Sequence, residues 1–201
     1  MGSALAADDV DSFTAGNVLV RARALGVLPD VSSKVDVIGG KADITDNYVP
    51  EVDGTYFLTP NIGFELIAAI TYHDVKDKGS IAGDIPLGSV RLLPPTLTAQ
   101  WHFLPAQKIN PYVGAGINYT FFYGVERSPL PIIHSTHYSD NVGAALQAGA
   151  DYNVSGRWYL NVDVKKIYLS TDVKLGTTLG PITAKADIDP WLVGLGVAYR
   201  F

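Results

Sequence analysis

The sequence predicts an all-β fold: an eight-stranded antiparallel transmembrane β-barrel with short periplasmic turns and long extracellular loops. Three observations predict it. Apolar residues alternate with small or polar ones along eight segments, short and long connections alternate between those segments, and aromatic residues gather at both ends of the apolar faces. The 20 glycines and 11 tyrosines in 201 residues are typical of strands and turns rather than helices. No apolar run reaches about 18 residues, so no transmembrane helix is expected.

Composition excludes several classes of protein. Hydrophobic residues make up 47% and charged residues 17% of the chain, which argues against disorder. The net charge of −5 argues against a nucleic-acid partner, which requires a basic surface. Cysteine is absent, which excludes disulfides, thiolate chemistry and cysteine-ligated metals. We expect neither a cofactor nor a metal.

The start of the chain differs in character from the remainder. Residues 1–16 are expected to form a flexible N-terminus, and residues 17–201 the barrel. Ser3-Ala4-Leu5-Ala6-Ala7-Asp8 has small residues in an A-x-A pattern that resembles the end of a signal peptide. An ordinary flexible terminus is an equally good interpretation.

Each expected strand has one apolar and one mixed face. The last eleven residues show this most clearly: alternate residues from Trp191 to Phe201 are all apolar or aromatic, whereas those between them are mostly small and end in Arg200. The same period of two predicts strands, in chain order, near 18–25, 48–59, 62–73, 97–103, 113–122, 144–152, 158–165 and 191–201. The second of these is the weakest.

The connections indicate lipid rather than a soluble core around the apolar faces. Short ones lie near 59–61, 104–111 and 153–156, and long ones near 30–47, 74–89, 124–140 and 170–188. Strict alternation of short and long is typical of outer-membrane barrels, and so are two aromatic girdles flanking an apolar band about 25 Å tall. The sequence therefore predicts the bacterial outer membrane as location and its lipid as partner. It does not indicate an oligomeric state.

The inner face changes from one end of the barrel to the other. Near the short turns it is polar, which predicts a lumen plug of paired charges, since buried charges must pair. The predicted plug residues are Arg21, Arg23, Glu65, Gln100, His102, Asp151, Asp163 and Arg200. Near the long loops the inner face is apolar, which predicts a ligand-binding upper lumen. Its residues are Leu25, Val27, Leu92, Phe122, Ile167, Leu169 and Leu192.

Several motifs resemble the OmpW/AlkL family of outer-membrane proteins. They are Asn61-Ile62-Gly63-Phe64-Glu65-Leu66, Pro111-Tyr112-Val113-Gly114-Ala115-Gly116, Ser170-Thr171-Asp172-Val173 and Asp187-Ile188-Asp189-Pro190-Trp191, together with the terminal aromatic. The resemblance covers most of the chain from about Asn17. It implies a lumen blocked towards the periplasm and uptake of small hydrophobic compounds that leave sideways through the barrel wall.

The function expected from these patterns is passive uptake of a small hydrophobic molecule. Such a ligand gains free energy from the apolar upper lumen but not from displacing paired charges. Pro50, Pro94 and Pro95 are candidates for a lateral gate, because proline cannot donate a ladder hydrogen bond. Two simpler interpretations remain open: the upper residues pack the interior, and the prolines mark strand ends. The alternative function is a structural or adhesive barrel whose apolar loops bind a surface partner.

Catalysis is not expected. His134-Ser135-Thr136-His137 with Asp140 offers the residue types of a triad, but a triad is recognised by geometry. G-x-S-x-G, P-loop and H-E-x-x-H motifs are all missing from the sequence.

Overall fold

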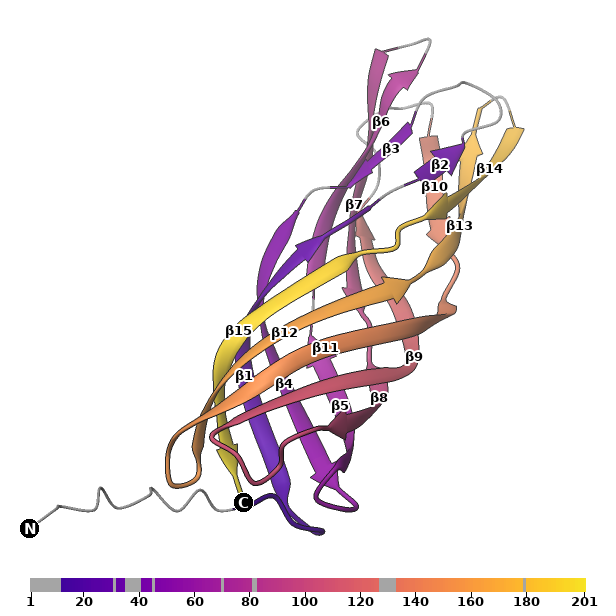
Figure 1. Ribbon diagram of the computed structural model, residues 1–201. Coiled ribbons are helices and arrows are strands. Elements are labelled where there is room, and N and C mark those ends of the chain that lie inside the picture. Colours follow the sequence, from indigo (N-terminus) through magenta and orange to yellow (C-terminus); the bar gives the residue numbers. More distant parts are fainter. Residues whose placement is uncertain are drawn as a thin grey trace, which may run out of the picture.

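The computed structural model describes residues 12–30, 32–34, 41–44, 46–69, 71–80, 83–126, 133–178 and 180–201. These residues form fifteen strands (Figure 1). The strands are β1 (Val18–Leu28), β2 (Ser32–Lys34), β3 (Lys41–Ile44), β4 (Asn47–Phe57), β5 (Ile62–Ala69), β6 (Thr71–Ser80), β7 (Gly83–Leu93), β8 (Thr96–His102), β9 (Ile109–Glu126), β10 (Ile133–Tyr138), β11 (Asn141–Ser155), β12 (Trp158–Tyr168), β13 (Ser170–Thr177), β14 (Gly180–Asp187) and β15 (Trp191–Arg200). The described residues include no helix long and apolar enough to cross a membrane.

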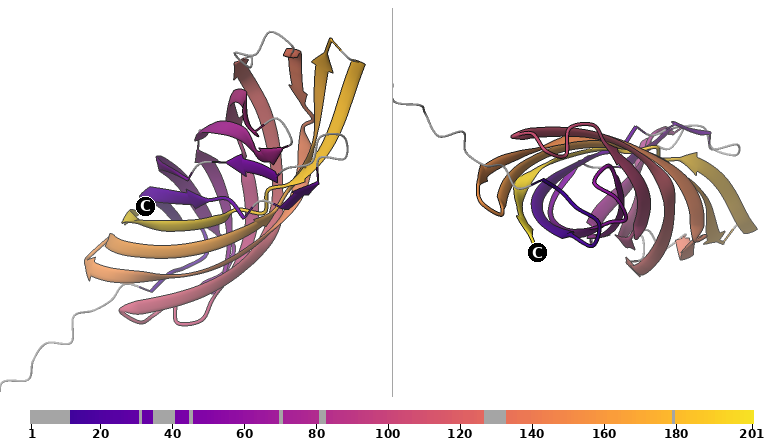
Figure 2. Two further views of the ribbon diagram at one scale, coloured as in Figure 1. Left: turned by 90° about the horizontal axis from the view of Figure 1, so that it is seen from above. Right: turned by 60° about the horizontal axis from the view of Figure 1, so that its bottom comes forward.

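Eight of the strands close into an antiparallel barrel. They follow one another in the order β11-β12-β15-β1-β4-β5-β8-β9, and β9 pairs back with β11 to complete the ring. The closed ring is visible from below in the right panel of Figure 2. The predicted fold class is therefore confirmed. The end with the short turns and the C-terminus is called the lower end here, and the opposite end the upper end (Figure 1).

The alternation in the sequence corresponds to the two faces of the barrel wall. Along β15, Val193, Leu195 and Val197 are 46%, 63% and 47% exposed, whereas Leu192 and Ala198 on either side of them point inward and are buried. A continuous belt of exposed apolar side chains is unfavourable in water and favourable in lipid.

Aromatic residues occupy both edges of this belt. Trp101, Phe103 and Trp158 are about half exposed near the lower end, and Tyr168 and Trp191 near the upper end, as the sequence predicted. Lys166 falls on the outer face by its position in β12. Its ammonium reaches the upper edge, where it lies 3.2 Å from Asp30 and 4.9 Å from the Trp191 ring centre.

The four long connections are present, but much of their length is hairpin rather than irregular loop. β6 pairs with β7, and β13 with β14, above the closed barrel. In Figure 1 these extensions form two groups, with β3, β6 and β7 in one and β2, β10, β13 and β14 in the other. Period-two alternation does not reveal such strands because both of their faces can meet water.

Prediction: replacing Leu195, halfway along β15, by arginine lowers the free energy of unfolding by about 2–4 kcal/mol, because the charge would face the middle of the lipid belt. Urea unfolding in lipid vesicles, followed by tryptophan fluorescence, measures this. Leu195→Ala is the matched control and keeps the site apolar. Equal destabilisation by both variants would contradict a lipid-facing position.

Candidate functional site: a layered barrel interior

The inward side chains of the eight strands form three layers. An aromatic layer closes the lower end, a layer of charges fills the middle, and an apolar cluster lies above it. Because an eight-stranded barrel is only wide enough for its own side chains, each layer extends across the whole interior.

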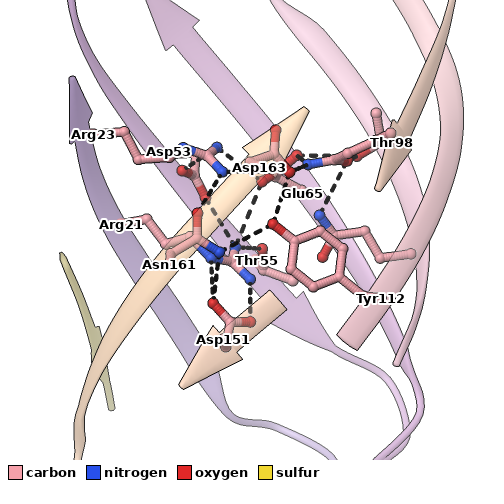
Figure 3. Close-up of polar contacts among 12 residues, drawn as sticks. Arg21, Arg23, Asp53, Thr55, Glu65, Thr98, Tyr112, Asp151, Asn161 and Asp163 are labelled. Carbon is pink, nitrogen blue, oxygen red and sulfur yellow. Dashed lines mark hydrogen bonds and ion pairs between the residues drawn. The ribbon is translucent and has the colours of Figure 1, made fainter. Parts of the chain in front are cut away.

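Arg21 of β1 is the centre of the charged layer (Figure 3). Its guanidinium binds Asp151 of β11 with two hydrogen bonds, 3.1 Å from Nε to Oδ1 and 2.9 Å from Nη2 to Oδ2. Its Nη1 donates to Asp53 of β4 at 3.1 Å and to Thr55 at 2.6 Å. The side chain is completely buried. One arginine therefore joins strands on opposite sides of the barrel.

Arg23, two residues further along the same face, lies close to three carboxylates and shares two of them, Asp53 and Glu65, with Arg21. Its Nε lies 2.7 Å from Glu51, and its Nη2 lies 2.6 Å from Asp53 and 3.1 Å from Glu65 of β5. Since the paired groups come from β1, β4 and β5, this arginine joins three neighbouring strands.

Lys165 of β12 completes the charged layer. Its ammonium lies 2.5 Å from Asp163, whose other oxygen accepts hydrogen bonds from Tyr112 and Gln147, both at 2.7 Å. Gln147 also donates to Glu65 at 2.8 Å. The acids are thus bound by neutral donors as well as by cations, which reduces the cost of burying them.

All eight predicted plug residues lie in the interior and are 4% exposed or less. The structure brings five of them into one ion network: Arg21, Arg23, Glu65, Asp151 and Asp163. Gln100 borders it through Gln147, and His102 follows through Gln100. Arg200 lies apart, in the aromatic layer below, with its guanidinium 5.5 Å from the Phe13 ring centre.

The sequence analysis missed Glu51, Asp53 and Tyr112. The same alternation could have found them, since Glu51, Asp53 and Thr55 follow each other at spacing two along β4, and Tyr112 shares the face of Gly114. Pro50 and Gly54 weaken the strand signal there because both residues are rare in strands.

The lower layer includes a residue that precedes the predicted barrel. Phe13 is 2% exposed and stacks on Phe57 with ring centres 4.6 Å apart, beside Tyr159 at 5.3 Å. The Phe13 amide donates to the Pro105 carbonyl, and Arg200 donates to the carbonyl of Ser12. Phe13 therefore packs into the lower mouth, whereas Ser12 and residues 14–16 are exposed; residues 1–11 of the expected flexible N-terminus lie outside the described residues.

The predicted upper-lumen residues are buried, and most pack together. Leu25, Val27, Ile167, Leu169 and Leu192 form one cluster with Ala145 and Ile188, all 8% exposed or less. Phe122 and Val49 are half-buried and pack against this cluster. Leu92 is also buried; it is the backbone partner of Phe122 in the pairing of β7 with β9.

The three predicted gate prolines flank β5 and β6 on both sides. The ladder between β4 and β5 ends at Glu51 opposite Ala69, next to Pro50. On the other side, β5 pairs with β8 up to Ile67 opposite Thr96, and β6 resumes with β7 at Thr71 opposite Leu92.

In that register Pro95 and Pro94 would face residues 68 and 69, but the described strands have no backbone pairs there. The prolines remain attached to β9, because Asn118 donates to both of their carbonyls and the Tyr119 amide donates to Pro95. Among the described residues, the ladder is therefore interrupted at the junction of β5 and β6, opposite Pro94 and Pro95.

Comparison with known proteins agrees with this architecture. Residues 14–201 match the OmpW family. The chain belongs to the OmpW family. Outer membrane protein W of Escherichia coli is 35% identical over 196 residues, which cover 93% of this chain and 89% of that protein. An uncharacterized outer-membrane protein, y4mB of Sinorhizobium fredii, is 46% identical over 184 residues, covering 90% of this chain and 79% of the relative.

A solved structure shows the same barrel. The crystal structure of the outer membrane protein OprG from Pseudomonas aeruginosa superposes with a TM-score of 0.89 at 27% identity, covering 96% of this chain and 99% of OprG. This member of the OmpW family is accordingly an outer-membrane protein, as its lipid belt and girdles predicted.

Prediction: Arg21→Met lowers the free energy of unfolding by about 3–5 kcal/mol, because it leaves the buried Asp151 without its cation and removes one of the two arginines paired with Asp53. Adding Asp151→Asn recovers part of the loss, since the two residues interact directly. Urea titration in lipid vesicles gives both values. Lys166→Met, which removes an edge cation, is expected to cost less than about 1 kcal/mol; equal losses for Arg21→Met and Lys166→Met would refute the ion network's structural role.

Proposed function

We propose that this protein is an outer-membrane channel for passive uptake of small hydrophobic molecules. They enter between the long hairpins, pass through the apolar cluster at the upper end and leave sideways through the wall. The observation that carries the proposal is the order of the layers. The apolar cluster at the upper end, called the upper compartment below, lies directly on the charged layer.

The charged layer and the aromatic layer beneath it oppose passage along the barrel axis. An apolar ligand that crossed the middle would have to separate Arg21 from Asp151 and Arg23 from Glu51, and it could offer no hydrogen bonds in return. Above this layer the same ligand gains roughly 25 cal/mol for each Å² it removes from water. The ligand therefore reaches the upper compartment and needs a route other than the axis.

The interrupted ladder around β5 and β6 supports a lateral route. Proline on both sides of this strand pair removes amide donors, so fewer hydrogen bonds have to break there. Half-buried Phe122 and Val49 border the upper cluster, so their movement admits a ligand while the ion network stays intact.

The name of one relative also supports a hydrophobic substrate. A Pseudomonas aeruginosa protein named dibenzothiophene metabolism operon protein PahQ is 31% identical over 180 residues, which cover 86% of this chain and 82% of the relative. Dibenzothiophene is a flat, apolar aromatic compound, of the class that the upper compartment suits.

Prediction: cells that produce this protein take up radiolabelled naphthalene faster than cells with an empty vector, and Phe122→Arg or Leu192→Arg abolishes the gain. Each arginine puts a charge into the apolar compartment. Surface abundance and folded-barrel electrophoretic mobility establish that both variants are assembled. Phe122→Leu is the matched control and keeps uptake. Uptake equal to the empty vector for the unaltered protein would leave the structural or adhesive barrel as the better interpretation.

Prediction: restoring ladder donors with the double substitution Pro94→Val and Pro95→Thr slows naphthalene uptake without destabilising the barrel. The new amide of residue 94 can pair with the β5–β6 strand and close the wall, whereas that of residue 95 faces Tyr119 of β9. The comparison is Pro60→Ala, in a short lower turn away from this site. Faster or unchanged uptake in the double variant would exclude exit at this junction.

A further inference from the structure

The charged layer has more acids than bases. It holds five buried carboxylates and three cations, all 3% exposed or less among the described residues. The acids are Glu51, Asp53, Glu65, Asp151 and Asp163, and the cations are Arg21, Arg23 and Lys165. His102 adds no charge, because its Nδ1 accepts from the amide NH₂ of Asn110, which can only donate. With all five acids ionised, two negative charges are in excess, and a buried excess favours uptake of positive charge.

Glu51 and Asp53 are the acids with the fewest hydrogen bonds; Asp53 Oδ2 has none, but it lies 2.6 Å from the Arg23 guanidinium. For Glu51, Oε1 accepts from Arg23 at 2.7 Å and lies 3.9 Å from Lys165, while Oε2 has no hydrogen bond among the described residues. By contrast, both oxygens of Glu65 and both of Asp163 have hydrogen-bond donors. At 2% exposure, Glu51 cannot rely on bulk water for the missing donor.

Glu51 also lies where the charged layer meets the upper compartment. The next inward residue on β4 is Val49, which packs against the apolar cluster. The backbone pair of Glu51 with Ala69 is the last one between β4 and β5, beside Pro50. A ligand in the upper compartment is therefore bounded below by this carboxylate, next to the interrupted part of the wall.

Lys165 is the cation next to the apolar cluster on β12, and it does not offer an anion site. It lies one inward position below Ile167, and three carboxylates already surround it, with Asp163 at 2.5 Å and Glu51 and Glu65 at 3.9 Å. A further anion would be repelled by these three groups.

We propose that Glu51 is a head-group site and that the preferred ligands are small amphiphiles with an apolar body and a protonated amine. The body occupies the apolar cluster, and the ammonium donates to Oε2 of Glu51 and offsets the excess negative charge. A charge-assisted hydrogen bond is about twice as strong as a neutral one, so an alcohol of the same shape binds more weakly. The inference rests on the proposed function and names its substrate class.

Three ligands with one body test this: 2-phenylethylammonium, 2-phenylethanol and phenylacetate. The chain has only three glutamates, Glu51, Glu65 and Glu126, so protein labelled with ¹³C at glutamate Cδ gives three carboxyl resonances. Each ligand is titrated into the labelled protein in lipid nanodiscs, and empty nanodiscs correct for partition of the ligand into lipid. The shifts give the affinity of the ligand, and the resonance that moves shows which glutamate it binds. Glu51→Asp keeps the charge and assigns the Glu51 resonance by its loss.

The expected result is a shift of the Glu51 resonance on adding the amine, with an affinity about tenfold or more above that of the alcohol. Phenylacetate is expected to bind least well. Glu51→Gln reduces the preference to about twofold or less, whereas Asp172→Asn, which removes an exposed acid on β13, leaves it unchanged.

The proposal is overturned if the amine binds no better than the alcohol, if the Glu51 resonance does not respond, or if the preference survives in folded Glu51→Gln protein. Where Glu51→Gln does not fold, the resonance shift in the unaltered protein decides. Equal binding of amine and alcohol would refute the head-group site but not the proposed channel. The excess negative charge would then be neutralised by protonation of the acids instead of by the ligand. Failure of all three ligands to bind would refute the proposed channel itself.

Discussion

The ion pairs around Arg21 are the interaction on which the rest of the interior depends. An eight-stranded barrel has no room for a water-filled channel beside its side chains, so every charge turned inward must find its partner among the other strands. Arg21 meets this requirement by reaching from β1 to β11 on one side and β4 on the other. The result is a crosslinked charged layer across the barrel, which separates the apolar cluster above it from the aromatic layer below it.

That separation gives the two ends of the barrel different roles. Below the charged layer, Phe13 and its aromatic neighbours close the mouth. Above it, side chains from several strands form an apolar cluster beneath the hairpin extensions. Beside this cluster the ladder between the described strands is interrupted at the junction of β5 and β6, opposite Pro94 and Pro95.

Much of this was predictable because the side-chain period in a strand is two. Once the apolar face of β15 was assigned to lipid, Arg200 and Leu192 had to point inward, and the same rule assigned Arg21 in β1 and Asp163 in β12. The rule worked because each barrel strand has lipid on one side and protein on the other. It did not predict β13 or most of β6, which extend beyond the lipid.

The sequence by itself determined the number of strands in the closed barrel, their inner and outer faces, the two girdles and the change from charged to apolar along the inner face. Those properties depend only on residues a few positions apart. Only the tertiary structure decided which charges pair, that Phe13 fills the lower mouth, and that Glu51 retains a free oxygen at the boundary between two layers. These features join residues up to 188 positions apart in the chain, as Ser12 and Arg200 are, and closure of the ring is what brings such residues together.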